Sequence, residues 1–330
     1  MSSVPITVAC GLYDRTLPIR DGRIPIEGCD INFIPMEPEE VFFRSLRYEE
    51  FDVSELSFSS YLMLTSRGEC PYIAVPAFVS RVFRHAAIYI RTDRGIRRPE
   101  DLKGRLVGVP EYQITAAVWA RGMLEEEYGV KPSDIRWRTG GLEETGRDER
   151  TPLTLDNGVE VKPIGEHQTL CAMLDAGEID ALITARNPSS YLRRVPNVDR
   201  LFPDYPEVEQ AYFRKTGLFP IMHIIGVRKT LADRYPWLAA SVYKAFSLAR
   251  DFAAKDLAQR GQLRVIMPWV ERDVDRVRAV MGDNYWPYGV KENIKSIEAI
   301  LRYAWTQGLL ARRLTPEEIF ARSTIEVSRL

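Results

Sequence analysis

The sequence predicts an α/β protein of two lobes, in which a second lobe is inserted into the first and a helical tail follows. Three observations support this class. Short β-rich runs alternate with helical patterns as far as residue 227, the pattern beyond that point is almost wholly helical, and 330 residues are more than one small core needs. We expect lobe one to comprise residues 1–92 and 226–330, and lobe two residues 93–225.

Lobe one is predicted to begin with a strand and a polar loop. The β-branched run PITVAC, residues 5–10, ends in a loop that carries Tyr13 and Arg15. Open α/β sheets place ligands at such strand ends, so both residues are candidates for ligand contact. The other expected elements of this lobe are strands at 30–35, 51–56, 71–79 and 86–91 and helices at 38–48 and 61–67.

Lobe two is predicted to open with residues 104–122, GRLVGVPEYQITAAVWARG, as a buried strand, a turn and a helix entry. The N–H groups at a helix start have no intrahelical partner and favour an anion, so Gln113 and Thr115 are candidate donors. An ordinary βα unit with Thr115 as a local cap remains the alternative. The other expected elements are strands at 135–139, 179–184 and 198–201, a helix at 170–176 and a charged surface excursion at 140–152.

The β-rich run at 219–227 is expected to return the chain to lobe one. Helices are then predicted at 230–234, 236–259, 273–281, 291–307 and 316–320. A lobe built from both ends of the chain, with a middle lobe inserted, is the arrangement of periplasmic binding proteins, which hold a ligand between their lobes.

Composition and motifs exclude several classes. Lysine plus arginine number 45 and aspartate plus glutamate 46, interspersed, so neither a nucleic acid nor an anionic membrane is expected as a partner. The N-terminus lacks the features of a signal peptide and no apolar run is long enough to span a membrane, so we expect a cytoplasmic protein. The four cysteines lack C-x-x-C spacing. The three histidines form no H-x-H or H-E-x-x-H pattern, which disfavours a metal site, although a cluster in space with Glu55 or Asp14 stays an alternative. Hydrolase, NTPase and dehydrogenase fingerprints are absent.

Several segments resemble the family of 4,5-dihydroxyphthalate decarboxylases, and the resemblance covers nearly the whole chain. They include FRHAAIYIR at 83–91, the stretch at 107–122, GEIDALITAR at 177–186, FPIMHIIGVRK at 219–229 and the segment 285–309. The resemblance implies a type II periplasmic-binding-protein fold and a non-oxidative decarboxylation that yields protocatechuate. The exact aromatic acid is left open.

The chemistry implied by this resemblance needs a base near a phenol, an acid near a ring carbon and a cation for the remaining carboxylate, with no organic cofactor. His85 and His223 are the preferred acid and base, because each lies on or beside a strand that crosses between the lobes. Either histidine could instead be structural. Glu55, at a predicted strand end, could take the phenolic proton, although a cap or an interlobe ion pair is equally consistent with its position. His167 is expected at the surface.

Arginine forks bind carboxylates in a bidentate way that lysine cannot reproduce. Arg15, Arg81 and Arg186 each follow a predicted strand and are the candidate clamps. Ser57 and Ser59 are candidate neutral donors, with local capping as the alternative. The arginines expected to be solvated are Arg147, Arg150, Arg193 and Arg194. The aromatic residues Trp286, Tyr288 and Trp305 could stack on an aromatic ring, but they are expected to serve packing or subunit contact.

Two rival functions remain. One is a binding protein for an aromatic or other small carboxylic acid, since this fold commonly captures ligands without chemistry. The other is a different lyase on the same fold, of the chorismate-dehydratase type. Apolar aromatic residues in the tail also suggest a homo-oligomer.

Overall fold

Two separate sheets organise the chain, as the prediction of an α/β fold required. The computed structural model describes residues 3–149, 151–153, 155, 157–257, 259 and 261–327. Unit 1 comprises Met1–Arg81, Thr216–Glu298 and Leu314–Leu330, and unit 2 comprises Val82–Lys215 and Ala299–Arg313. No helix among the described residues is long and apolar enough to cross a lipid bilayer.

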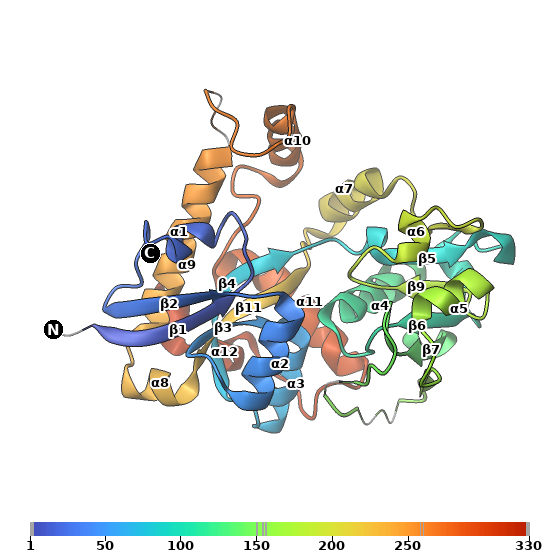
Figure 1. The fold of residues 1–330 in the computed structure, drawn as a ribbon, viewed down its shortest axis with the longest axis horizontal. Helices are drawn as coiled ribbons and strands as arrows, with labels where there is room; N and C mark the ends of the chain where they lie inside the picture. The colour runs from blue at the N-terminus through green and yellow to red at the C-terminus, as the bar shows by residue number, and fades with distance from the viewer. Residues whose placement is uncertain are drawn as a thin grey trace. The chain divides into compact units, whose positions relative to one another are not determined.

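Unit 1 is built on a five-stranded sheet in the order β2-β1-β3-β11-β4 (Figure 1). Strand β1 pairs in parallel with β2 on one side and with β3 on the other, whereas β11 runs antiparallel to β3 and β4. The strands are β1 (Val4–Cys10), β2 (Cys29–Pro35), β3 (Val53–Ser57), β4 (Tyr72–Arg81) and β11 (Ile221–Arg228). Every residue of β3 is buried, because helices and neighbouring strands cover both of its faces.

Helices of unit 1 pack on both sides of this sheet. Helices α2 and α3 contact β3, and α9 contacts β4. The helix α2 follows the expected pattern, with Pro38 in its first turn and Val41, Phe42 and Ser45 on its buried face. The helices are α1 (Leu17–Arg20), α2 (Pro38–Tyr48), α3 (Phe58–Arg67), α8 (Lys229–Arg234), α9 (Leu238–Leu257), α10 (Val270–Met281), α12 (Pro316–Ile319) and α13 (Arg322–Val327).

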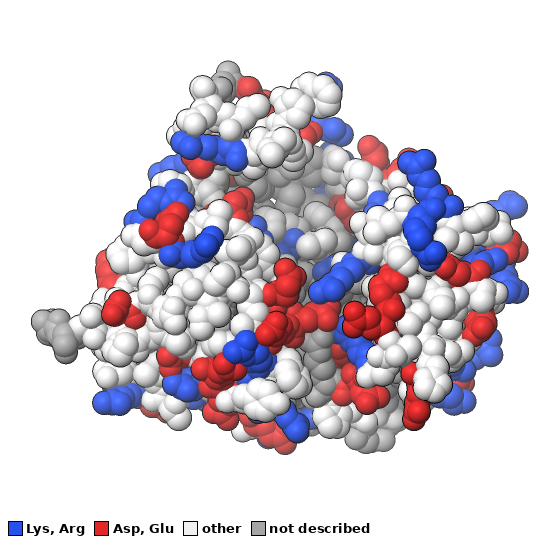
Figure 2. Space-filling model, in the orientation of Figure 1, with Lys and Arg blue, Asp and Glu red and all other residues white. Residues whose placement is uncertain are grey.

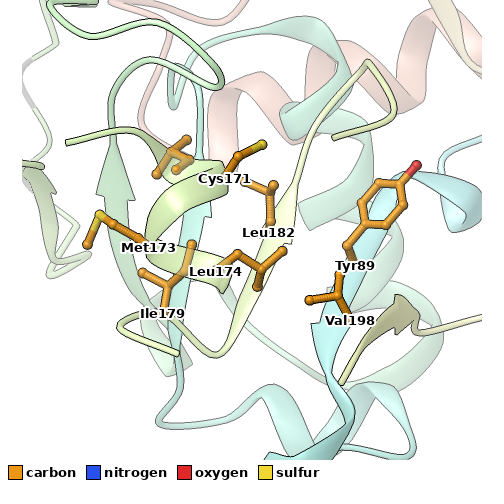
Figure 3. Close-up of a cluster of buried hydrophobic side chains, with 8 residues drawn as sticks. Tyr89, Cys171, Met173, Leu174, Ile179, Leu182 and Val198 are labelled. Atoms are coloured by element: carbon orange, nitrogen blue, oxygen red, sulfur yellow. The ribbon is translucent and has the colours of Figure 1, made fainter. Parts of the chain in front are cut away.

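Unit 2 is built on a six-stranded sheet in the order β10-β5-β9-β6-β7-β8. Its strands are β5 (Ile88–Arg91), β6 (Leu106–Val109), β7 (Arg136–Thr139), β8 (Val161–Pro163), β9 (Ala181–Ile183) and β10 (Val198–Arg200). Its helices are α4 (Thr115–Tyr128), α5 (Leu170–Ala176), α6 (Ser189–Leu192) and α7 (Tyr205–Thr216), and α11 (Val290–Thr306) has its C-terminal part here. Figure 3 shows part of the core, where Leu174 of α5 meets Leu182 of β9 and Tyr89 of β5.

The unit boundaries differ from the predicted lobes at three places. Strand β5, which we expected in lobe one, pairs with β9 and β10 of unit 2. Strand β11 lies wholly in unit 1, although the predicted boundary at residue 226 divides it. Residues Ala299–Arg313 of the tail belong to unit 2, because the Gln307 amide bonds both to the Arg121 guanidinium and to the Val118 carbonyl of α4.

The predicted elements otherwise correspond to observed ones, but helices α1, α6, α7 and α13 and strand β8 had no counterpart among the predictions. Helix α7 received no prediction, although Pro206 at its second residue is a typical helix-start signal. On the face shown in Figure 2, blue and red side chains are interspersed, in keeping with the net charge of −1.

Candidate functional site

The carboxylate of Glu55 is the centre of a polar cluster inside unit 1. Parallel pairing of β1 with β3 joins Ala9 to Ser54, which brings the end of β1 beside Glu55. The Gly11 N–H donates to Glu55 Oε2 at 2.8 Å, and the Cys10 thiol donates to the same oxygen at 3.3 Å. Glu55 was predicted at a strand end, but it lies inside β3 and is completely buried.

The second oxygen of Glu55 binds two further side chains. In the antiparallel pairing of β11 with β3, Ile225 lies opposite Glu55 and His223 lies opposite Ser57. His223 is therefore a diagonal neighbour of Glu55 on the same face, and its Nδ1 is 2.6 Å from Oε1. The Tyr13 hydroxyl donates to Oε1 at 2.7 Å.

This environment keeps Glu55 ionised. Burial alone would raise the pKa of Glu55, but the hydrogen bonds from His223, the Gly11 N–H and the Tyr13 hydroxyl lower it below its ordinary value. The same charge acts on the neighbours, because burial together with the Glu55 charge raises the pKa of the Cys10 thiol and of the Tyr13 phenol. Both groups are therefore protonated donors near neutral pH.

An ionised Glu55 also fixes the tautomer of His223. A carboxylate only accepts hydrogen bonds, so Nδ1 of His223 carries the proton and Nε2 is the nitrogen left for chemistry. The ring packs edge-on against Phe42, with 4.8 Å between ring centroids. The His223 side chain is 20% exposed whereas that of Glu55 is 0%, so the imidazole is the part of the pair that a ligand can reach.

The Tyr13 ring lies against the backbone of Gly11, so a side chain at position 11 would displace that ring. A Cβ on Gly11 would lie 2.7 Å from the Tyr13 ring atom Cζ, closer than side chains tolerate. This contact lets the loop after β1 fold tightly over Glu55, with the Tyr13 hydroxyl pointing back to the carboxylate.

Arg15 is held beside the cluster by two aromatic rings. Its guanidinium carbon lies 4.3 Å from the centroid of Tyr13 and 4.6 Å from that of Trp286. Its Nε donates to the Val79 carbonyl at 2.6 Å and its Nη1 to Asp14 at 2.9 Å. Nη2 makes no hydrogen bond within the described part of the chain, so Arg15 retains a donor for an anionic ligand. Trp286, expected to serve packing or subunit contact, thus packs on a residue beside the cluster.

Three other predicted binders of unit 1, Arg81, Ser57 and Ser59, are buried. The Arg81 guanidinium is buried and bonds to the Phe219 carbonyl at 2.6 Å and the Asn293 side chain at 2.6 Å, so its position argues against a substrate clamp. Burial lowers the pKa of Arg81 to about 9. Ser57 and Ser59 are also buried, and Ser57 makes no side-chain cap to α3.

The structure places His85 inside unit 2 rather than at an accessible strand end. It begins a short 3₁₀ helix, is 1% exposed and lies between the rings of Phe202 and Tyr212. Both ring nitrogens lack hydrogen-bond partners among the described residues. Burial lowers the pKa of His85 to about 4, so it is neutral at physiological pH and poorly suited to donate a proton.

The predicted anion position before α4 is filled by a carboxylate of the chain itself. The N–H of Tyr112 donates to Glu149, which comes from the segment predicted as a surface excursion. Burial raises the pKa of Glu149 to about 7. The hydrogen bond from the Tyr112 N–H lowers this pKa, and the charge of Glu111 raises it. The side chains of Gln113 and Arg147 both bond to Glu111, so the prediction of a solvated Arg147 is wrong. Arg150 lies outside the described residues.

Three further predictions, for Thr115, Arg186 and His167, can be compared with the structure. The N-cap of α4 is Ile114 without a side-chain cap, so Thr115 is not the cap and instead starts the helix, where it is buried. Arg186 is exposed in the loop after β9, and its contact with a ligand stays a prediction. His167 is exposed at the surface, as predicted.

Comparison with known proteins decides the family. The chain is 44% identical over 326 residues to 4,5-dihydroxyphthalate decarboxylase of Comamonas testosteroni, an alignment that covers 99% of both chains. The chain belongs to the 4,5-dihydroxyphthalate decarboxylase family. A second member, from Pseudomonas putida, is 47% identical over 214 residues, which is 65% of this chain and 83% of that protein. The predicted family and its carboxy-lyase class are thus confirmed.

This decarboxylase family member has the fold of a substrate-binding protein. A family model described as the periplasmic substrate-binding protein of a phosphonate ABC transporter matches residues 26–196. Among solved structures, the aliphatic sulphonate-binding protein SsuA of Escherichia coli aligns over 99% of both chains at 13% identity with a TM-score of 0.54. The alkanesulfonate-binding protein SsuA of Xanthomonas axonopodis pv. citri aligns over 98% of both chains at 14% identity and 0.52. At these identities the structures establish the fold alone.

Cys10 and the Gly11 N–H are the members of the cluster that the sequence analysis did not single out. Both end the first strand, and parallel neighbours in an α/β sheet finish at the same edge. The signal was therefore present, because the strand that ends at Cys10 was expected to lie in the same lobe as the strand carrying Glu55.

Proposed function

We propose that this chain catalyses the non-oxidative decarboxylation of 4,5-dihydroxyphthalate, or a closely related hydroxylated aromatic acid, to protocatechuate and CO2. The observation that carries the proposal is the 44% identity, over 99% of both chains, to a decarboxylase named for that substrate. The Glu55–His223 pair supplies the chemistry such a reaction needs, because it joins a buried carboxylate to a partly exposed imidazole.

Each carboxyl-bearing carbon of this substrate lies para to a hydroxyl. Nε2 of His223 takes the phenolic proton, and the ionised Glu55 stabilises the resulting imidazolium through Nδ1. Electron density moves to the para ring carbon, which takes up a proton from a second donor. The carbon–carboxylate bond then breaks, CO2 leaves, its bonding electrons restore the aromatic ring, and the imidazolium returns its proton to the phenolate. The net reaction consumes one proton.

We do not assign the second proton transfer to His85, because its buried ring has a pKa lowered to about 4 and is neutral near pH 7. For the carboxylates we propose Arg15, whose Nη2 has no partner among the described residues and whose plane the Tyr13 and Trp286 rings fix. We also propose Arg186, which follows β9 and is exposed. No organic cofactor enters this scheme.

Turnover distinguishes this proposal from its rivals. Purified protein is incubated with 4,5-dihydroxyphthalate, and CO2 and protocatechuate are followed together. A decarboxylase releases both in equal amounts. A binding protein takes up the compound and releases neither, and a lyase of the chorismate-dehydratase type leaves it unbound and unchanged.

We further propose a cytoplasmic homo-oligomer. Of the tail aromatics, Tyr288 is only 4% exposed whereas Trp305 is 36% exposed. Larger apolar exposure lies between α9 and α10, where Ile266 and Trp269 stand out of the surface. Light scattering on the chain and on Trp269→Glu tests this assignment, because a dimer built on this segment would dissociate in the variant and a monomeric chain would not change.

A further inference from the structure

Arg200 lies at the edge of the unit 2 sheet where ligands are expected. It is the last residue of β10 and lies opposite Tyr89 of β5 in antiparallel register. Strand β5 is also antiparallel to β9, and β9 is parallel to β6, so β10, β9 and β6 all end at one edge. Open α/β sheets bind ligands outside the carboxyl ends of their strands, so Arg200 occupies the position of a ligand contact.

The polar groups around the half-buried Arg200 guanidinium are uncharged. Its Nη2 donates to the Asn187 side-chain oxygen at 3.2 Å, and the Tyr89 hydroxyl donates to that same oxygen at 2.6 Å. The Tyr205 hydroxyl is a further neighbour. Nε is buried without a hydrogen-bond partner among the described residues. Nη1 also makes no hydrogen bond within the described chain but, unlike Nε, is not buried, so a ligand can reach it.

Two acidic residues of neighbouring positions do not neutralise Arg200. The Asp199 carboxylate accepts the backbone N–H of Arg200 at 2.7 Å rather than a guanidinium N–H. Glu209 of α7 accepts the Ala86 N–H at 3.2 Å, and burial raises its pKa to about 7. Within the described part of the chain, no carboxylate forms an ion pair with Arg200. A partly desolvated charge without a counter-ion costs free energy, which an anionic ligand would recover.

Three tyrosine rings hold the Arg200 guanidinium in place. Its central carbon lies 4.7 Å from the ring centroid of Tyr205, 4.8 Å from that of Tyr191 and 5.8 Å from that of Tyr89. Contacts of a cation with ring faces orient the group without cancelling its charge. The guanidinium is therefore fixed before a ligand arrives, which lowers the entropic cost of binding.

The uncompensated charge defines the class of ligand. The two terminal nitrogens of a guanidinium form a fork that matches the two oxygens of a carboxylate. The loop that carries Asn187 also carries Arg186, so this edge presents two arginines, as a dicarboxylate requires. We propose that Arg200 binds a carboxylate of the aromatic acid, held in position by Asn187 and the three tyrosine rings. The identity of the acid rests on the proposed function, whereas the carboxylate class rests on the charge of Arg200.

Calorimetric titration with phthalate tests this role without turnover, because phthalate has both carboxylates but lacks the phenol that the reaction needs. Arg200→Met should weaken phthalate binding by roughly tenfold or more, the loss of about one charge-assisted hydrogen bond. Phthalamide, the neutral diamide, should bind the parent and this variant equally. In turnover of 4,5-dihydroxyphthalate, Arg200→Met should raise KM and leave kcat within about threefold of the parent.

Asn187→Asp separates ligand binding from a structural role of Arg200. The variant keeps the oxygen that accepts from Arg200 and Tyr89, but it supplies the counter-ion that the guanidinium lacks. Its phthalate affinity should fall roughly tenfold, while its denaturant midpoint stays unchanged or rises. A purely structural Arg200 would gain stability in this variant without any loss of binding.

Arg105→Met is the matched control. It removes one positive charge from the same sheet, but Arg105 directly precedes β6 and so lies at the opposite edge. Its phthalate affinity should stay within about twofold of the parent.

Phthalate that does not bind the parent, or that binds either Arg200→Met or Asn187→Asp as tightly as the parent, would overturn the proposal. So would an equal loss in Arg105→Met. Asn187→Asp decides alone if Arg200→Met does not fold. Because binding is measured directly, absence of decarboxylation would refute the proposed function and leave the carboxylate site at Arg200 standing.

Discussion

Replacing Glu55 with glutamine removes one charge and keeps the shape of the side chain, so it isolates what the carboxylate does. Four donors converge on Glu55, and glutamine offers one oxygen to them. The Gly11 N–H cannot turn into an acceptor, so the amide oxygen must face Gly11. The amide NH2 then faces His223 Nδ1, which becomes an acceptor, and the ring proton moves to Nε2. The histidine is left in the tautomer that cannot take a proton from a phenol.

The expected loss of activity follows from that tautomer. A well-placed general base contributes about 10²–10⁴ in rate, so kcat of Glu55→Gln should fall by roughly 10³ with KM within about threefold of the parent. Charge-assisted bonds become neutral ones, and unfolding free energy should fall by about 2 kcal/mol. Steady-state release of protocatechuate and denaturant unfolding measure the two quantities separately.

Asp52→Asn, at the residue directly before β3, is the matched control. The Asp52 carboxylate also accepts a backbone N–H from β1, that of Thr7 at 2.8 Å, and it pairs with Arg228, but none of its contacts among the described residues is a histidine. This variant should lose comparable stability and keep its kcat. If Glu55→Gln keeps kcat within about tenfold of the parent, or if Asp52→Asn loses activity equally, the pair does not act as the base.

Three further outcomes are expected. His223→Ala should abolish turnover while substrate binding survives, as equilibrium titration would show, and unchanged kinetics would remove His223 from the site. Arg186→Ala and Arg15→Ala should mainly raise KM, because each is proposed to bind a carboxylate, and an effect confined to kcat would contradict this role. Finally, the lowered pKa of Glu55 contributes stability that is present above its ordinary pKa of about 4.3 and is lost as the pH falls through the folded-state value. Acid unfolding below about pH 4 should therefore be steeper in the parent than in Glu55→Gln, and equal slopes would show that Glu55 is not the responsible group.

Most of the longer strands and helices could be predicted from residue patterns because they have a clear apolar period, whereas α7, in which only Tyr212 is buried, was missed. The alternation in 5–10 and the stripe in 38–48 correspond to β1 and α2 almost residue for residue. The unit boundaries were harder, since β5 and the end of α11 are assigned by long-range contacts such as that of Gln307 with Arg121, which no local pattern encodes.

The site was predictable in part for the same reason. His223 and Glu55 were chosen from their strands, but their direct contact depends on the register of β11 against β3. His85 was chosen on equal sequence grounds, and only its surroundings of Phe202 and Tyr212 reveal a buried ring. The charged segment at 140–152 was predicted to be solvated, because no local sequence pattern indicates that Glu149 accepts a hydrogen bond from the Tyr112 N–H.

Because Glu55 lies inside the buried strand β3, catalytic activity depends on the register of β3 against its neighbouring strands. Successive side chains of a strand alternate between its faces, so a slip of β3 by one residue would exchange Glu55 for Ser54 or Leu56 beside His223. A misaligned sheet would keep much of its apolar burial and its helical circular dichroism yet hold an unpaired imidazole. Recovery of activity during refolding should therefore lag behind recovery of secondary structure wherever such slipped forms accumulate.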